Sequence, residues 1–407
     1  MLIRGGRLID PSQGIDAARD VRIEHGLVAE IGEHLTAMAG EETVDASNAC
    51  VAPGFIDMHV HLREPGFPQK ETIATGTLAA VRGGFTAVAC MPNTQPALDT
   101  PETLAQLGAI VARDAQCRVY PVAAITRERA GEAPVDFEAL AAAGAVAFSD
   151  DGNTVMNARV LRDAAVQPRE VRGVFISHAE DDNLKGDAVM NEGGLSEDVI
   201  VARDLLIAMH TGKPWHIAHL STARSLELLR WARSHGATAT CEVTPHHLVF
   251  TEDAIATWGA AAKVNPPLRK EADVRALREG VRDGTIDAFA SDHAPHTDEE
   301  KSGDLRTAAV GFTGLEIAVG AYALALPDLP LLRFVAMLST NPARILGIEG
   351  GTLRVGSRAD VTIFADRPWV VDPRQFASKG HTTPFKSATL PRRAIATIVG
   401  GELRYRR

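Results

Sequence analysis

The most informative segment of the chain is Pro53-Gly54-Phe55-Ile56-Asp57-Met58-His59-Val60-His61. It is a short apolar run, typical of a buried β-strand, and it ends in two histidines separated by one residue. Because side chains alternate along a strand, His59 and His61 project from the same face. Two imidazoles on one face at a strand end predict a metal clamp, although paired strand histidines also occur without a metal.

Seven further apolar runs follow along the chain, and helical patterns separate most of them. Strands are expected at 85–90, 118–123, 145–148, 173–178, 215–219, 238–243 and 287–292. Helices are expected at 71–82, 102–115, 136–143, 156–165, 197–211, 222–235, 271–283, 314–325 and 330–338. Strands that alternate with helices pair in parallel, so eight such units predict an α/β fold, a closed (β/α)8 TIM barrel. An open doubly wound sheet is the alternative, but no GxGxxG motif follows the first strand.

The two ends of the chain have a different pattern. Residues 1–52 contain short alternating runs with tight turns, and the same style returns at 353–365 and 393–405. We therefore predict a small β-sandwich domain formed by residues 1–52 and 345–407, and a catalytic barrel domain over 53–344. Residues 368–392 contain three prolines and are expected to be irregular.

Composition narrows the class of protein and its partners. The 407 residues are 45% hydrophobic and 23% charged, which is typical of a globular protein with a sizeable core. The net charge of −10 argues against nucleic acid or an anionic membrane as the partner, so a small-molecule substrate is expected. No run reaches the roughly 18 apolar residues of a membrane span and no apolar signal segment opens the chain, which predicts a cytoplasmic protein. The cysteines are far apart and predict reduced thiols: Cys50, Cys90, Cys117 and Cys241.

Further metal-binding residue types fall at the carboxyl ends of the expected strands. Asp150-Asp151 follow the fourth, His178 the fifth, His219 the sixth and Asp292-His293 the eighth. Barrel enzymes keep their active sites at this face. Several imidazoles with carboxylates favour zinc or another first-row ion over calcium or magnesium, and the set is large enough for two ions.

Several segments then resemble the motifs of the dihydroorotases, in the cyclic amidohydrolase superfamily. The resemblance starts at residues 53–66, where Leu62-Arg63-Glu64-Pro65-Gly66 follow the two histidines. It continues in order over nearly the whole chain, through Met91-Pro92-Asn93-Thr94, Phe148-Ser149-Asp150-Asp151-Gly152, His219-Leu220-Ser221-Thr222, Glu242-Val243-Thr244-Pro245-His246-His247-Leu248, Asn265-Pro266-Pro267-Leu268-Arg269 and Ser291-Asp292-His293-Ala294-Pro295-His296.

The resemblance implies a role for each matching residue. Two Zn²⁺ ions per subunit would be bridged by Asp151 and a hydroxide, and Asp292 would both ligate and act as the general base. The remaining metal ligands would be His59 and His61 on the more buried ion, and His178 and His219 on the other. The substrate would be contacted by His61, Arg63, Asn93, Asn265, His296 and the backbone at Val310 and Gly311. A guanidinium fork such as that of Arg63 matches a carboxylate bidentately.

The implied activity is the reversible, zinc-dependent cyclisation of N-carbamoyl-L-aspartate to L-dihydroorotate in pyrimidine biosynthesis. In ring opening, zinc-bound hydroxide would attack the cyclic amide, and Asp292 would move the proton to the departing nitrogen. We also expect a homodimer or an association with aspartate transcarbamoylase, between which the sequence does not decide. Many cyclic amidohydrolases carry a carboxylated lysine at the end of the fourth strand, but residues 147–151 contain none.

Two alternatives remain. Hydantoinase, dihydropyrimidinase or allantoinase activity shares the barrel and the paired histidines, but those relatives use the absent lysine and have less need of Arg63. An inactive scaffold for aspartate transcarbamoylase is the other, and such a scaffold is expected to have lost metal ligands.

Three expectations concern neighbouring residues. His216 has the opposite strand parity to His219 and should pack behind the barrel. His246 and His247 either orient a ligand or are structural. Residues 297–312 form a polar loop whose position suggests a lid that orders over substrate.

Overall fold

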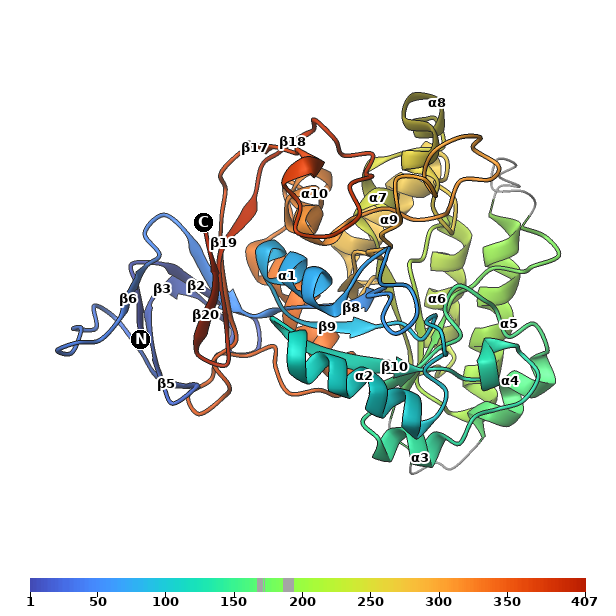
Figure 1. Ribbon diagram of the computed structural model, residues 1–407, viewed down its shortest axis with the longest axis horizontal. Helices are drawn as coiled ribbons and strands as arrows, with labels where there is room; N and C mark the ends of the chain where they lie inside the picture. The colour runs from blue at the N-terminus through green and yellow to red at the C-terminus, as the bar shows by residue number, and fades with distance from the viewer. Residues whose placement is uncertain (167–170, 172, 186–193) are drawn as a thin grey trace.

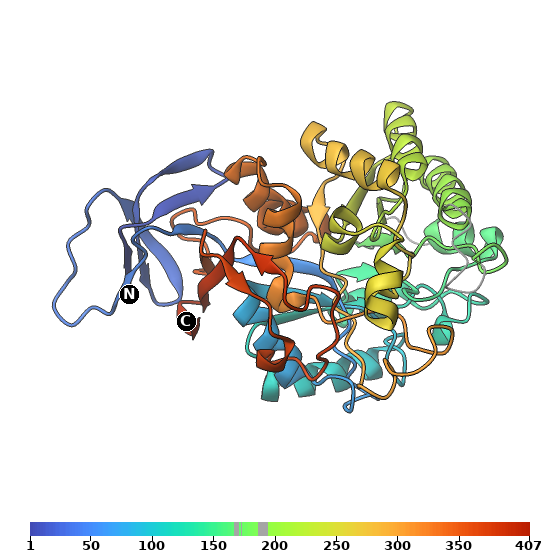
Figure 2. The same cartoon turned by 90° about the horizontal axis from the view of Figure 1, so that it is seen from above.

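The computed structural model describes residues 1–166, 171, 173–185 and 194–407. A β-rich unit that contains both termini lies at one end of the molecule, and a barrel surrounded by helices forms the rest (Figure 1). The view from above shows the same two parts side by side (Figure 2).

The barrel consists of eight parallel strands in sequential order from β8 to β15. They are β8 (Phe55–Val60), β9 (Phe85–Cys90), β10 (Arg118–Ala123), β11 (Ala147–Phe148), β12 (Val174–Ser177), β13 (Trp215–Ile217), β14 (Ala239–Val243) and β15 (Ala288–Phe289). The barrel closes where β8 meets the segment after β15, through an isolated parallel bridge between Val60 and His293. The His61 amide donates to the His293 carbonyl across the same seam, at 2.8 Å. The predicted TIM barrel is confirmed, and each expected strand overlaps an observed one, although those expected at 145–148 and 287–292 contain strands of only two residues.

Helices surround the barrel and lie close to their predicted ranges. Those that match predicted ranges are α1 (Ile73–Gly83), α2 (Pro101–Asp114), α3 (Phe137–Ala142), α4 (Ala158–Ala165), α5 (Leu195–Thr211), α6 (Ala223–Ser234), α9 (Glu271–Asp283) and α10 (Ala318–Ala325). Threonines cap several of them: the Thr72 and Thr100 side chains each accept a backbone N–H and form a capping box. The helix expected at 330–338 is α11 (Leu331–Val335) followed by a π-helical turn, Ala336–Thr340.

Three short helices were not predicted, namely α7 (Pro245–Val249), α8 (Ala254–Trp258) and α12 (Asn341–Leu346). Each has five or six residues, so none shows two full turns of apolar periodicity. Short 3₁₀ turns complete the helical structure at Arg127–Arg129, Gly259–Ala262, Leu315–Ile317 and Pro373–Gln375.

Strands from both ends of the chain form the β-rich unit. One sheet has the order β5-β4-β1-β6 and contains β1 (Leu2–Arg4), β4 (Asp20–Glu24), β5 (Leu27–Gly32) and β6 (Thr43–Asp45). The other has the order β20-β19-β16-β7-β2-β3 and contains β2 (Arg7–Asp10), β3 (Ile15–Ala18), β7 (Cys50–Pro53), β16 (Val361–Ala365), β19 (Arg393–Val399) and β20 (Glu402–Arg406). A ribbon of β17 (Trp369–Val370) and β18 (Thr389–Leu390) lies apart from both.

One apolar cluster lies between the four-stranded and the six-stranded sheet of the β-rich unit. Ile3, Val21 and Ile23 come from the first sheet, and Val361 and Ile398 from the second. This is the expected sandwich core. We keep the division into 1–52 with 345–407 and 53–344 as a proposal, and note that α12 runs across its 344/345 boundary.

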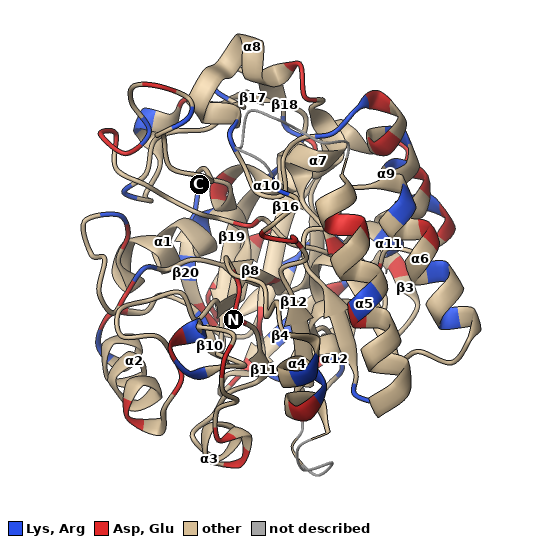
Figure 3. Ribbon diagram, turned by 90° about the vertical axis from the view of Figure 1, so that its right-hand side faces the viewer, with Lys and Arg blue, Asp and Glu red and all other residues tan. Residues whose placement is uncertain are grey.

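The barrel interior is filled, so a site can form only at its ends. Ile56, Met58, Ala89, Ile176 and Ala290 belong to one buried cluster contributed by the barrel strands. Lys, Arg, Asp and Glu are interspersed over the outer helices (Figure 3). Among the described residues, no helix has the length and apolar character required to cross a bilayer.

Candidate active site

Four histidines and two aspartates from the ends of five barrel strands meet at the carboxyl end of the barrel. Asp151 lies at the centre. Its Oδ1 is 3.3 Å from His59 Nε2, 3.6 Å from His178 Nδ1 and 3.7 Å from His219 Nε2, and its Oδ2 is 3.5 Å from His61 Nε2. All six side chains are buried. The structure therefore places every residue that the sequence predicts as a metal ligand in one buried cluster.

This cluster fits a divalent metal ion by its geometry. Two groups of three have ligand atoms within 4.8 Å of one another: His59, His61 and Asp151, and Asp151, His178 and His219. The two groups share Asp151. His59 Nε2, Asp151 Oδ1 and His219 Nδ1 are buried and have no hydrogen-bond partner within the described ranges. Buried polar atoms are normally paired. An ion bound between the residues of these triads would give His59 Nε2 and Asp151 Oδ1 a partner.

Neighbouring side chains fix the orientation of three imidazoles. His59 Nδ1 lies 2.7 Å from Glu242 Oε1, His61 Nδ1 lies 2.8 Å from Asn93 Oδ1, and His178 Nε2 lies 3.0 Å from Glu180 Oε2. Since the three oxygens accept, each of these nitrogens donates, so the opposite nitrogen is the one that would bind an ion once it carries no proton.

The charges of the cluster shift its pKa values strongly. Burial alone would lower the pKa of His59 and His178, but neighbouring carboxylates outweigh it, so the pKa of His59 is well above its ordinary value and that of His178 is raised to about 10. Burial opposes ionisation of Asp151, yet the His59 charge and its histidine partners hold the pKa of Asp151 well below its usual range. Burial and the Arg63 charge lower the pKa of His61.

Asp292 approaches the cluster from the end of β15. Its Oδ1 is 3.2 Å from His61 Nε2 and 3.7 Å from His59 Nε2. These histidines outweigh burial and hold the pKa of Asp292 well below its ordinary value, so the group is an ionised acceptor. Asp292 has φ +48°, a strained conformation for a non-glycine residue. The backbone beside it is held by Asp57, whose carboxylate accepts the Ser291 amide at 3.1 Å.

Asp150 serves a different purpose from its neighbour Asp151. Its carboxylate accepts the amides of Ile125 and Thr126 at 2.8 and 3.0 Å, and also the Thr126 hydroxyl. It ties the segment after β11 to the segment after β10, and these contacts hold its carboxylate away from the histidines.

A cavity of about 240 Å³ opens above the cluster. Eleven of the predicted residues line it, together with Gly152 and Ala294: His61, Arg63, Asn93, Asp151, His178, His219, Asn265, Asp292, His296, Val310 and Gly311. His59 lies below the cavity wall, fully buried. The structure thus gathers every predicted substrate contact in one cavity.

Arg63 and His296 are adjacent in this cavity. Arg63 donates from Nε to the Pro295 carbonyl at 3.2 Å, and its Nη2 is 3.2 Å from His296 Nε2. Burial lowers the pKa of Arg63 to about 10, so it stays charged at neutral pH. Burial and Arg63 lower the pKa of His296 to about 4, and its Nδ1 lies 3.1 Å from Glu300 Oε2.

Two buried lysines fix the loop 297–312, Lys301 from within the loop and Lys263 from outside it. Lys301 Nζ donates to the carbonyls of Ala309 and Gly311 at 2.8 and 2.7 Å, and Lys263 Nζ donates to that of Ala308 at 2.7 Å. The loop is thereby positioned to present Val310 and Gly311. Its movement as a lid stays a prediction.

The neighbouring histidines behave differently from one another. His247 Nε2 contacts the Pro266 carbonyl at 3.0 Å and so supports the loop with Asn265. His246 is buried against Phe312, and burial lowers its pKa to about 3. The prediction for His216 was wrong: its Nε2 lies 3.2 Å from Glu242 Oε2 inside the barrel. The strand ends at Ile217, and His219 has φ +33°, so simple alternation does not extend across these residues.

Glu180, Glu242 and His216 are the parts of the site that sequence reasoning missed. The one charged residue of a short strand is the signal that could have pointed to Glu242, since such a charge is buried only with a partner. Glu180 stands two residues beyond His178 and carries no comparable signal.

This fold and site define an amidohydrolase. Comparisons agree: residues 49–225 match the family model described as "Dihydro-orotase-like", and residues 208–405 match the "Amidohydrolase family" model. The chain is 48% identical to a dihydroorotase of Pelotomaculum thermopropionicum, over 99% of this chain and 98% of the relative. It is 45% identical to a dihydroorotase of Pelobacter propionicus, over the full length of both.

Solved structures extend the comparison to the fold. L-hydantoinase (dihydropyrimidinase) from Arthrobacter aurescens superposes with a TM-score of 0.89 at 24% identity, over 99% of this chain and 95% of that one. At this identity the likeness concerns the fold alone. The chain belongs to the dihydroorotase family.

Proposed function

We propose that this protein catalyses the reversible cyclisation of N-carbamoyl-L-aspartate to L-dihydroorotate, a step of pyrimidine biosynthesis. One observation carries the proposal: the buried, charged Arg63 shares a 240 Å³ cavity with the histidine and aspartate cluster. A buried guanidinium needs an anionic partner, and the ring carboxylate of dihydroorotate provides one. Family membership supports the same choice.

We further propose two zinc ions in the cluster. His59 and His61 would hold one ion, His178 and His219 the other, with Asp151 between them and Asp292 as a further ligand. Bound there, zinc supplies a Lewis acid for the amide carbonyl and lowers the pKa of a bound water. The histidine-rich ligand set favours zinc over calcium or magnesium.

The protein's own residues position the substrate and move the proton. Arg63, Asn93 and His296 hold the carboxylate, while Asn265 and the backbone at Val310 and Gly311 hold the ring. With the ring amide fixed above the cluster, Asp292 accepts a proton from the attacking water and delivers it to the departing ring nitrogen. In cyclisation the same group returns the proton as water leaves.

A spectrophotometric assay of dihydroorotate ring opening tests this function. It is run on the purified protein as isolated, after chelation, and after zinc is restored. We expect activity that disappears with the chelator and returns with zinc. No turnover of dihydroorotate with zinc bound would exclude the proposal; dihydrouracil, hydantoin and allantoin then test the related activities, and failure on all of them favours the scaffold alternative.

The assembly and location are separate proposals. We propose a cytoplasmic homodimer that can also associate with aspartate transcarbamoylase. Sedimentation of the purified protein, alone and mixed with that enzyme, distinguishes the two states.

A further inference from the structure

Two buried carboxylates stand behind the proposed metal centre, and each contacts the imidazole of a histidine from a different triad. Glu242 Oε1 is 2.7 Å from His59 Nδ1, and Glu180 Oε2 is 3.0 Å from His178 Nε2. Both carboxylates are almost completely buried, with side-chain exposures of 1% and 2%. Neither lines the substrate cavity.

Such charges are costly to bury, so their partners matter. An isolated buried carboxylate costs several kcal/mol, and an apolar side chain of similar size usually serves folding as well. Glu242 in the barrel interior therefore needs a reason other than packing. Contact with the outer nitrogen of a metal-binding imidazole is such a reason, because it fixes the ring and its tautomer and makes the inner nitrogen a stronger ligand.

Glu242 is itself held by a chain of polar contacts through the barrel. Its Oε2 is 3.2 Å from His216 Nε2, and His216 Nδ1 is 2.7 Å from the Thr240 hydroxyl. Because a carboxylate only accepts, His216 Nε2 donates to it, and Nδ1 can accept from Thr240. Glu242 Oε1 also accepts the His219 backbone amide at 3.3 Å.

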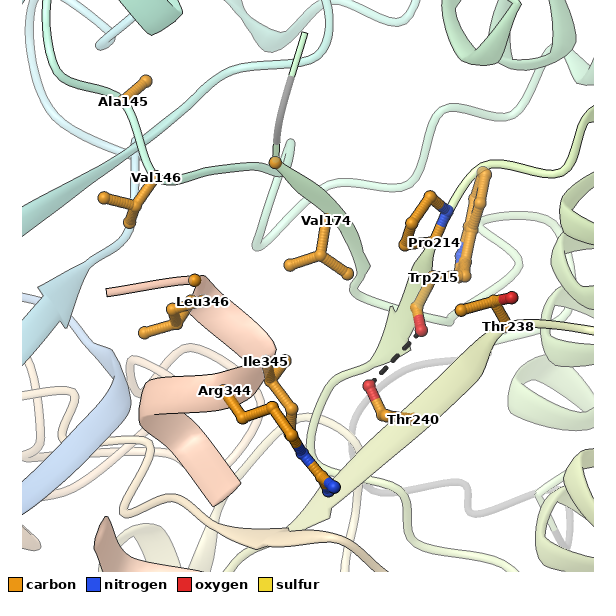
Figure 4. Close-up of a pocket in the computed structure, with 12 residues that line it drawn as sticks. Ala145, Val146, Val174, Pro214, Trp215, Thr238, Thr240, Arg344, Ile345 and Leu346 are labelled. Carbon is orange, nitrogen blue, oxygen red and sulfur yellow. Dashed lines mark hydrogen bonds between the residues drawn. The ribbon is translucent and has the colours of Figure 1, made fainter. Parts of the chain in front are cut away.

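The chain of contacts ends at the opposite end of the barrel from the site. Thr240 lines a cavity of about 540 Å³ that is bordered mostly by apolar side chains from the starts of the strands and from α12. Figure 4 shows the Thr240 hydroxyl beside the Trp215 carbonyl, which lies 3.4 Å away and is a second, more distant acceptor for the one hydroxyl proton. Thr240 can thus be changed without touching the cluster.

We propose that Glu242 and Glu180 are positioning residues, each of which orients one histidine and so sets the affinity of one metal ion and not of the other. The inference rests on the proposed two-ion centre. Glu242 acts through His59 with His216 as its support, and Glu180 acts through His178.

The test is a chelator competition on the holoenzyme with zinc alone, in which each ion's dissociation constant is measured by a zinc indicator and the zinc content by elemental analysis. Glu242→Gln keeps an oxygen for His59 and for the His219 amide but removes the charge. We expect it to raise the dissociation constant of the ion held by His59 and His61 about 10- to 100-fold. The dissociation constant of the other ion should change less than about threefold. Glu180→Gln should weaken the other ion instead.

Control variants separate positioning from general destabilisation. Asp10→Asn removes a fully buried carboxylate in the sandwich, where it accepts the Leu353 amide, and should leave both dissociation constants unchanged. In a His59→Gln background, Glu242→Gln should not further weaken binding of the ion at His59 and His61. Glu180→Gln should retain its full effect on the affinity of the other ion. If Glu242→Gln does not fold, Thr240→Val tests the same chain and should weaken the same ion severalfold.

The outcomes are distinct. Equal weakening of both ions by either glutamine variant, or no change beyond twofold, would overturn the inference, as would a wild-type protein that binds fewer than two ions. A wild-type protein that binds two ions but does not turn over dihydroorotate would contradict the proposed function, while the separate loss of each ion would still support this inference.

Discussion

His59 Nε2 and Asp151 Oδ1 face each other at 3.3 Å in the centre of the site, and neither atom has a hydrogen-bond partner in the part of the chain that the structure describes. Both are buried. This arrangement is typical of two ligands that share one ion, and it makes the protonation of the cluster part of its chemistry.

Metal binding should release protons. Carboxylates raise the pKa of His59 well above its ordinary value and that of His178 to about 10, so both imidazoles are protonated at pH 7.5 without metal. An ion must displace these protons, and its affinity should therefore rise with pH up to about 10. Calorimetric titration with zinc in buffers of different ionisation enthalpy should show release of about two protons. Release near zero at pH 7.5 would contradict this account.

The same shifts predict how the metal-free protein responds to pH. A histidine whose folded pKa is raised stabilises the fold fully below its unfolded pKa of about 6.5, and this contribution is lost as pH rises through the folded value. For His178 the loss extends to about pH 10. Urea unfolding of the chelated protein should show a lower free energy of unfolding at pH 10 than at pH 7.

The adjacent aspartates Asp150 and Asp151 should give opposite phenotypes. Asp151→Asn removes the charge shared by both triads, and we expect loss of zinc and a fall in kcat of at least about 100-fold. Asp150→Asn weakens the contacts to Ile125 and Thr126, and we expect a lower Tm with kcat changed less than about threefold. Zinc analysis, kcat and thermal unfolding on both variants check this. Retention of two zinc ions by Asp151→Asn would refute the assignment.

Much of this fold could be read from the sequence, because the barrel strands are short apolar runs separated by amphipathic helices. The end of β8 identified His59 and His61, and the resemblance to the dihydroorotase motifs selected Asp151; in the structure Asp151 faces His59, whereas Asp150 accepts the Ile125 amide. The error at His216 shows the limit of that argument: alternation holds only within a regular strand, and β13 stops at Ile217.

The outer contacts of the site could not be predicted in the same way. Glu242 contacts His59, which lies 183 positions away in the sequence. Glu71 likewise contacts the distant side chains of His293 and Ser378. Such pairs depend on how the barrel closes and on how residues 371–390 pack against it. A single sequence contains no signal for these distances.

Arg63 should determine selectivity for a ring that carries a carboxylate. Arg63→Lys keeps the charge but loses the planar fork, and we expect KM for dihydroorotate to rise about 10- to 100-fold with kcat changed less than fivefold. Arg63→Met should raise KM further. Steady-state kinetics on dihydroorotate and dihydrouracil check this, since the preference between the two should shrink in both variants. An unchanged KM in Arg63→Met would show that the carboxylate binds elsewhere.

Lys301 should control the order of the loop 297–312. Its side chain is buried and donates to the Ala309 and Gly311 carbonyls, so Lys301→Met removes two contacts that hold the loop at the cavity. We expect faster hydrogen exchange at 305–311 in the free enzyme and a severalfold higher KM, because substrate must then supply the ordering free energy.

The exposed Lys270 provides a matched control as Lys270→Met. Substrate should restore slow exchange in Lys301→Met and should also slow it in the wild type if the loop acts as a lid. Identical exchange in free Lys301→Met and wild type would mean that the loop is held by its other contacts, including that of the Gly311 amide to the Lys263 carbonyl at 2.9 Å.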